Sequence, residues 1–193
     1  MSDVRIVLGK RGMGKSTRLV EMLKLESRFI LFNTLGEECY EVFETCRTFK
    51  ALCEVILSER PCFQINYRGI HDGLSTEQDF DFCTRLILQC QNVVFAVDEI
   101  DQHQKPISLP QSLENIVSLG RHQDISFWCA TRRAHLIHPL IRSQANEIHI
   151  FHQWEPRDIE WLKECIGNRA YEVPNLPKYC SIIWRDTDGI PIA

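Results

Sequence analysis

A nine-residue stretch, residues 9–17, constrains the fold of this chain more than any other part of its sequence. It fills every fixed position of the phosphate-loop pattern G-x-x-x-x-G-K-[ST]. The stretch consists of Gly9, Lys10, Arg11, Gly12, Met13, Gly14, Lys15, Ser16 and Thr17. An apolar run, Val4–Leu8, comes before it, and apolar residues at helical spacing come after it. The pattern therefore predicts a buried strand, a phosphate-binding loop and a helix, in that order.

Each part of this loop has a chemical role. The glycines let consecutive backbone N–H groups point at phosphate oxygens, and the helix N-terminus adds a partial positive charge. We expect Lys15 to contact the β- and γ-phosphates of a nucleotide and the Ser16 hydroxyl to ligate Mg²⁺. A glycine-rich turn before an ordinary helix is the alternative, and the complete pattern with its flanks favours the nucleotide site.

Two carboxylates follow a second apolar run, Val93–Val97. Ligands of α/β proteins bind at the carboxyl ends of the strands, so Asp98 and Glu99 are expected beside the phosphate loop. Asp98 is suited to holding Mg²⁺, and Glu99 to acting as a general base that orients an attacking water. A solvated acidic turn is the alternative, and the upstream phosphate loop makes it less favoured. We expect the nearby Asp101 to be a solvated loop residue.

Four arginines in the second half of the chain are candidates for stabilising charge on the γ-phosphate, within one subunit or from a neighbour. They are Arg121, Arg132, Arg133 and Arg142. Arg121 comes just before the apolar run Ile125–Ala130, and Arg132 comes directly after it. Surface arginines are usually just solvated, so the sequence leaves that alternative open for each one.

The predicted secondary structure alternates between strands and helices. Strands are expected at Val4–Leu8, Arg28–Phe32, Cys62–Tyr67, Asn92–Val97, Ile125–Ala130, Glu147–Phe151 and Ser181–Trp184. Helices are expected after the phosphate loop and near Phe49–Leu57, Phe80–Cys90, Pro110–Leu119 and Pro156–Ile166, whereas residues 37–46 fit either a helix or irregular structure. This order predicts an α/β fold with a mostly parallel central sheet and helices on both faces.

Composition narrows the class of protein. The chain has 193 residues and a formal net charge of −4, so we expect a single domain over residues 1–193 with any nucleic-acid contact confined to a local surface. It shows neither a signal-peptide core nor a membrane span, which favours a cytoplasmic location. None of its nine cysteines form a C-x-x-C pair. Cys39, Cys46 and Cys53 are seven apart and could share one helix face, where small core residues are favoured over a metal or redox cluster.

Taken together, these motifs resemble the FtsK–HerA group of P-loop ATPases, which have a RecA-like ASCE fold. Within that group the chain is similar to the genome-packaging ATPases of tailless, membrane-containing viruses and to the filamentous-phage morphogenesis (Zot-like) ATPases. The phosphate loop and residues 95–99 are shared by many ATPases. The narrower resemblance rests on residues 120–131, 144–148 and 155–158, and the whole resemblance runs from Val4 to about Arg185.

The resemblance implies ATP and Mg²⁺ as cofactors and a homo-oligomeric ring, usually a hexamer. It further implies double-stranded DNA in the central pore, contacted through its backbone without sequence preference. Viral capsid or vertex proteins are candidate partners, and the host cytoplasm or the virion the expected location. It also implies that an arginine at the place of Arg121 reaches the neighbour's γ-phosphate. Members usually have a phosphate-sensing Gln where this chain has Arg132, and a guanidinium would donate to phosphate without positioning water as an amide does.

Three functions remain as alternatives. An ATP-driven DNA translocase, of the viral packaging type, is the leading hypothesis. A small-molecule or nucleotide kinase would need an acceptor pocket and a mobile lid, and the sequence points to neither. A nucleotide-switched assembly ATPase that moves no DNA fits the acidic net charge. ATP is favoured over GTP because no N-K-x-D segment, which reads guanine, is present.

Overall fold

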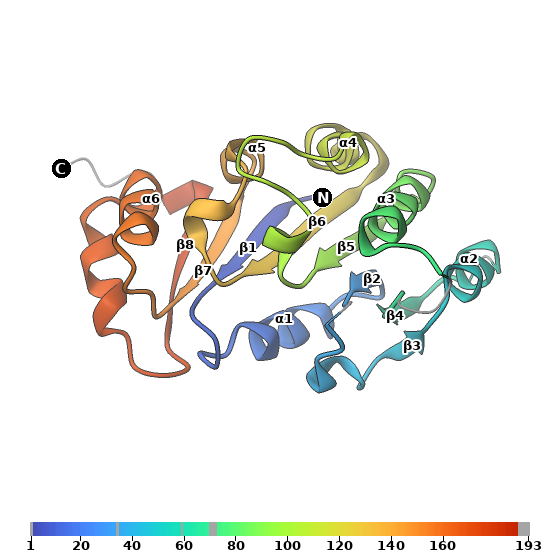
Figure 1. The fold of residues 1–193 in the computed structure, drawn as a ribbon, viewed down its shortest axis with the longest axis horizontal. Helices are drawn as coiled ribbons and strands as arrows, with labels where there is room; N and C mark the ends of the chain where they lie inside the picture. The colour runs from blue at the N-terminus through green and yellow to red at the C-terminus, as the bar shows by residue number, and fades with distance from the viewer. Residues whose placement is uncertain (1, 34, 59, 70–72, 189–193) are drawn as a thin grey trace.

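One eight-stranded sheet forms the centre of the part of the chain that the structure describes (Figure 1). The structure is a computed structural model that describes residues 2–33, 35–58, 60–69 and 73–188. The strand order is β3-β4-β2-β5-β6-β1-β7-β8. The strands are β1 (Val4–Leu8), β2 (Arg28–Phe32), β3 (Glu44–Cys46), β4 (Phe63–Tyr67), β5 (Val93–Val97), β6 (Ile125–Thr131), β7 (Glu147–Phe151) and β8 (Ser181–Arg185).

The direction of these strands decides what lies at each edge of the sheet. β1 to β7 all run parallel to one another, so their carboxyl ends share one edge. β8 pairs antiparallel with β7, with Phe151 opposite Ser181 and Glu147 opposite Arg185. The start of β8 therefore lies at the edge where the other strands end. The confirmed fold is α/β with a mostly parallel sheet, as the alternation of elements predicted.

The described residues form six α-helices that cover the two faces of the sheet unequally. They are α1 (Lys15–Leu23), α2 (Phe49–Leu57), α3 (Thr76–Ile87), α4 (Gln111–Leu119), α5 (Pro139–Ser143) and α6 (Pro156–Ile166). Apolar residues of α2 to α6 belong to the larger core cluster. The smaller cluster, on the opposite face, contains the apolar residues of α1 together with Tyr40 and Phe43 (Figure 1). At the β7–β8 end of the sheet, the described helices therefore lie mainly on the face that α6 covers.

Local chemistry explains where several helices begin. The Ser75 hydroxyl accepts a hydrogen bond from the Gln78 N–H while the Gln78 side chain accepts one from the Ser75 N–H, which fixes the start of α3. Thr48 caps α2 in the same way through the Ala51 N–H. Pro156 begins α6, where a missing N–H costs no helical hydrogen bond.

The sequence-based expectation for residues 37–46 needs correction. This segment contains a 3₁₀ turn, Glu38–Tyr40, and then the short edge strand β3. Cys39, Cys46 and Cys53 consequently lie on three different elements, so the idea that they share one helix face is wrong. Each of the three is a free thiol. A spacing of seven residues places side chains on one face only within a continuous helix, and these three cysteines do not share a helix.

Helices long and apolar enough to cross a membrane are not found in the described part of the chain.

Candidate nucleotide site

The phosphate loop joins β1 to α1 with a backbone that opens toward solvent. Gly12 and Gly14 adopt positive φ angles of 77° and 106°, a region that L side chains rarely adopt. Gly14 is the N-cap of α1 and has no side chain to accept a hydrogen bond, so the first N–H groups of the helix receive no side-chain cap at this position. Backbone donors and the positive end of a nine-residue helix therefore meet at one place, which suits an anion.

Lys15 brings a buried positive charge to this loop. Its side chain is 5% exposed, and its Nζ lies 3.9 Å from Glu99 Oε1. Burial lowers the pKa of Lys15, while the carboxylates of Glu99 and Asp98 act in the opposite direction. A cation held in a sheltered site interacts strongly with an anionic ligand because water screens it little.

Asp98 directly follows β5 and is held by two hydrogen bonds. Its Oδ1 accepts from the Glu99 N–H at 3.0 Å, and its Oδ2 accepts from the Tyr40 hydroxyl at 2.9 Å. The Tyr40 hydroxyl also hydrogen-bonds the Ser16 side chain. The three side chains of Ser16, Tyr40 and Asp98 therefore converge, although they come from α1, the 3₁₀ turn after β2, and the turn that follows β5. Burial, followed by the charge of Glu99, raises the pKa of Asp98 to about 6.

These donors fit Mg²⁺ bound together with a nucleotide. Ser16 and Asp98 offer the hard oxygen ligands that Mg²⁺ prefers, and this ion usually takes one or two protein ligands with phosphate oxygens and waters. Among the described residues, no group of three or more His, Cys, Asp and Glu side chains could hold a metal ion by itself. The arrangement thus suits a cation that arrives with the phosphates.

Glu99 has an unusual backbone and a charged partner. Its φ of 53° and ψ of 55° lie in the left-handed region, which costs a non-glycine residue about 1–3 kcal/mol and is often found at functional sites. Its carboxylate is 6% exposed, and Oε1 accepts a hydrogen bond from Arg132 Nε at 2.8 Å. This bond raises the pKa of Arg132. The arginine that replaces the expected sensor Gln therefore lies against the proposed general base.

Asp101 is not the solvated loop residue that the sequence suggested. It lies in the 3₁₀ turn Ile100–Gln102, where its Oδ1 accepts a hydrogen bond from the Thr131 hydroxyl at 2.6 Å. Thr131 is fully buried at the end of β6. This bond links the turn after β5 to the end of β6, so it fixes the two segments that carry Glu99 and Arg132.

The remaining candidate arginines do not join this group. Arg133 points at α6, where it pairs with Glu155 at 3.2 Å and with Asp158 at 3.3 Å. Arg142 pairs with Glu164 on α6. Arg121 lies in the 3₁₀ turn Gly120–Gln123 that precedes β6, which places it at the amino edge of the sheet, opposite the phosphate loop. Arg121 therefore does not belong to its own subunit's site, and a role for it in a neighbouring subunit's site stays a prediction.

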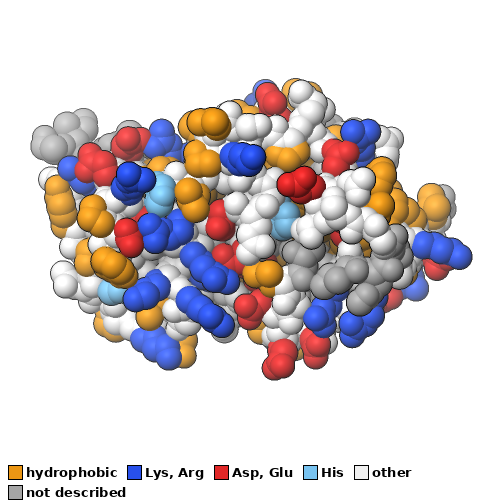
Figure 2. Space-filling view, viewed as in Figure 1, with side chains coloured by type: hydrophobic (Ala, Val, Ile, Leu, Met, Phe, Trp, Pro, Cys, Tyr) orange, Lys and Arg blue, Asp and Glu red, His pale blue; other side chains and the backbone are white. Residues whose placement is uncertain are grey.

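A cavity of about 340 Å³ brings these residues together. Phosphate-loop residues, Glu99 and Arg132 line it, and so do Glu37, Cys39 and Tyr179, which sequence reasoning missed. The last three had no motif to mark them. Lys and Arg side chains gather over the part of the surface where the loop between β1 and α1 lies (Figure 2).

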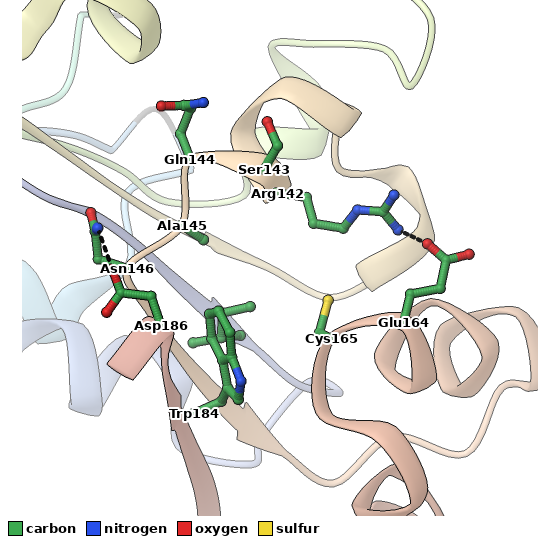
Figure 3. A pocket seen from close by; sticks show the side chains of 10 residues that line it. Arg142, Ser143, Gln144, Ala145, Asn146, Glu164, Cys165, Trp184 and Asp186 are labelled. Atoms are coloured by element: carbon green, nitrogen blue, oxygen red, sulfur yellow. Dashed lines mark hydrogen bonds and ion pairs between the residues drawn. The ribbon is translucent and has the colours of Figure 1, made fainter. Parts of the chain in front are cut away.

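A second cavity, of about 520 Å³, lies away from this chemistry. Its walls come from α5, α6, the start of β7 and the end of β8, and they include Asn146, Cys165 and Trp184 (Figure 3). The Arg142–Glu164 ion pair closes one side of it (Figure 3). The start of β7 and the end of β8 form the sheet edge opposite the phosphate loop. Size therefore does not identify the functional site here; the convergence of charged groups does.

Solved structures with the same fold are found, although neither a comparison with protein families nor one with curated proteins gives a match. The genome-packaging NTPase of Sulfolobus turreted icosahedral virus 2, in complex with ATP-γ-S, aligns with a TM-score of 0.75 and 18% identity over 97% of this chain and 93% of that one. The N-terminal domain of zonular occludens toxin from Neisseria meningitidis gives a TM-score of 0.55 and 15% identity over 95% and 94%.

A third similar structure is the pCW3 conjugation coupling protein TcpA, with a TM-score of 0.60 and 12% identity over 98% of this chain and 59% of that one. At these identities the likeness concerns the fold. The neighbours nevertheless include both kinds of protein that the sequence motifs resemble, a viral packaging NTPase and a Zot domain. The chain has the P-loop NTPase fold of these ATPases, and the resemblance drawn from its sequence is confirmed at that level.

Proposed function

We propose that this protein is an ATP-hydrolysing motor that translocates double-stranded DNA, of the kind that packages viral genomes. One observation carries the proposal: Lys15, Ser16, Asp98, Glu99 and Arg132 meet at one edge of the sheet, around the N-terminus of α1. The fold shared with a packaging NTPase that was solved with a nucleotide analogue supports it.

The chemistry follows from the contacts of these residues. Lys15 and the loop N–H groups bind the phosphates. Glu99 accepts a proton from the attacking water, and general-base catalysis of this kind contributes about 10²–10⁴-fold in rate. Arg132 is close enough to Glu99 to donate to the γ-phosphate once that group is bound beside it. Bound Mg²⁺, held by Ser16 and Asp98, would neutralise phosphate charge.

A ring of subunits accounts for the position of Arg121. This residue is exposed at the amino edge, away from its own phosphate loop. In a homo-oligomeric ring, for which we propose a hexamer, it would face the neighbour's γ-phosphate and act mainly in the transition state. We further propose host cytoplasm or the virion as the location and capsid or vertex proteins as partners.

Contact with DNA must be local because the chain carries a net charge of −4. A ring repeats one basic side chain around its pore, so few basic residues per subunit suffice. The segment 103–105, which follows the 3₁₀ turn Ile100–Gln102, is one candidate for this contact. The other candidate, Tyr67–Gly73, lies partly outside the described residues.

The test is steady-state ATP turnover, with and without double-stranded DNA, across DNA lengths and salt concentrations. Glu99→Gln keeps the shape and removes the base, so turnover should fall about a hundredfold or more while ATP binding persists. Glu114→Gln makes the same chemical change on an exposed face of α4 and should leave turnover intact. Stimulation by DNA should be independent of sequence and decrease steeply with salt, because backbone contacts release counterions.

Other outcomes point to the alternatives. Turnover that no DNA stimulates at low salt would favour the nucleotide-switched assembly ATPase. Phosphorylation of an added acceptor would favour the kinase. Mixing Arg121→Ala subunits with Glu99→Gln subunits tests the ring: activity returns in part if Arg121 acts across an interface, whereas mixed oligomers that stay inactive would refute that role.

A further inference from the structure

A cavity of about 550 Å³ lies beside the phosphate loop, on the α1 face of the sheet. Its walls include Gly14, Thr17, Arg18, Phe151, Tyr179 and Ile183. This volume is within the range of about 300–1,000 Å³ that is typical of small-molecule sites. Phosphates bound at the loop would lie next to this cavity and leave it unfilled.

The strand pairing explains why this space exists. Phe151 lies opposite Ser181 and His149 opposite Ile183, so these side chains share the face of β7 and β8 that α1 approaches. The Arg18 Nε of α1 donates to His149 Nδ1 at 3.2 Å, which ties the helix to β7. Beyond this hydrogen bond, toward β8, the wall of the cavity consists of Ile183 and Ser181. Among the described residues, no helix covers this part of the sheet on the face where α1 lies. The gap between α1 and β8 therefore remains open.

The cavity adjoins the phosphate site. Gly14, Thr17 and Tyr179 line both cavities. A Cβ built on Gly14 would lie 3.1 Å from Tyr179 Cδ1 and 3.3 Å from Phe151 Cε1, so the two rings close tightly over the loop backbone. A molecule whose phosphates occupy the loop can therefore extend into this space, past the Tyr179 ring.

The chemistry of the walls selects what part of a molecule fits. Phe151, Tyr179 and Ile183 are apolar or aromatic, and the Tyr179 side chain is exposed, so a flat group can stack on the ring face that Lys178 does not cover. The Arg18 guanidinium in this wall is already engaged, because it donates to His149 through Nε and to Glu21 through NH1, and the Lys178 ammonium lies over the Tyr179 ring, 4.7 Å from its centroid. Such walls suit a flat, uncharged group with a sugar, not a second phosphate.

We propose that this cavity binds the base and ribose of the nucleotide, with the base packed against Tyr179. The inference rests on the proposed nucleoside triphosphate substrate and adds the residues that hold its nucleoside part. Tyr179 reaches the site because β8 runs antiparallel to β7 and so begins at the edge where the phosphate loop lies. Its φ of 68° is in the left-handed region, which marks a constrained turn into β8.

The experiment compares two ligands that share phosphates and differ in the nucleoside: ATP and inorganic tripolyphosphate. Their affinities for the full chain are measured by calorimetric titration with Mg²⁺ present, for the wild type and for Tyr179→Ala, Tyr179→Phe and Lys15→Ala. Loss of one stacking ring should weaken ATP about tenfold to a hundredfold. We expect this loss in Tyr179→Ala for ATP alone, with tripolyphosphate affinity unchanged. Tyr179→Phe, which keeps the ring, should bind ATP nearly as the wild type does.

The outcomes separate this inference from the proposed function. Unchanged ATP affinity in Tyr179→Ala would overturn the inference, and so would an equal loss for both ligands, since the ring would then act on the phosphate loop. A wild type that binds tripolyphosphate as tightly as ATP would also refute it while leaving the phosphate site intact. Lys15→Ala should weaken both ligands. If the wild type binds neither, the proposed function fails together with the inference.

Discussion

The contact between Arg132 and Glu99 makes a prediction that can be tested without nucleotide. A charge-assisted hydrogen bond contributes about 1.5–3 kcal/mol. The Arg132 side chain is 37% exposed, so solvent screens the pair and we reduce the expected coupling energy to about 1–2 kcal/mol. Lys15 Nζ, 3.9 Å from the same oxygen, keeps a positive charge near Glu99 after Arg132 is removed.

The assay is a double-mutant cycle on thermal unfolding with Arg132→Ala, Glu99→Ala and the double variant. The backbone strain at Glu99 is the same in both variants that carry alanine there, so the cycle removes it. A change of 1 kcal/mol shifts the melting temperature of a chain of this size by about 2–4 °C. The coupling should also weaken as salt rises, because the pair is partly exposed.

A neighbouring arginine provides the matched control. Arg133 adjoins Arg132 in sequence but pairs with Glu155 and Asp158, so its cycle with Glu99 should give a coupling near zero. Coupling below about 0.3 kcal/mol between Arg132 and Glu99 would refute the reasoning, since changes at independent sites add within that margin. The Arg132 guanidinium would then not bind the Glu99 carboxylate when the protein is in solution. Its proposed role at the γ-phosphate would have to be supported by other evidence.

Four further predictions concern Asp98, Tyr40 and Asp158. The affinity for nucleotide in the presence of Mg²⁺, measured by titration, should decrease as pH falls through about 6, because a protonated Asp98 is a poor metal ligand. Equal affinity at pH 5 and pH 7 would contradict this. The same raised pKa means that the folded state holds this proton more tightly, so the contribution of Asp98 to the free energy of unfolding decreases as pH rises from 3.8 to about 6. Tyr40→Phe removes a hydrogen bond that lowers the pKa of Asp98, so the midpoint of that titration should move to higher pH, and an unmoved midpoint would show that the bond is unimportant. Asp158→Asn leaves Arg133 and His135 without a carboxylate at a fully buried position and should cost about 1–3 kcal/mol in thermal unfolding, whereas an unchanged melting temperature would mean that the charge is dispensable.

The sequence by itself determined the fold class and the position of two motifs within it. The loop that contains Lys15 and the pair Asp98 and Glu99 each follow an apolar run, and both runs became parallel strands. The carboxyl ends of parallel strands share one edge, so the two motifs had to lie at the same edge once the sheet was parallel. Patterns of this kind are local, and they do not depend on which strand lies beside which.

Only the tertiary structure decided which side chains complete the site. Tyr40 meets Asp98 because a 3₁₀ turn, in a segment with no clear periodicity, packs under α1. Arg132 meets Glu99 because β6 lies next to β5 and runs parallel to it, so the residues that follow the two strands lie at the same edge of the sheet. Tyr179 reaches the phosphate loop because β8 reverses direction, while Arg121, which precedes β6, is left at the opposite edge. Strand order and direction set these contacts between distant residues, and no local pattern in the sequence specifies either of them.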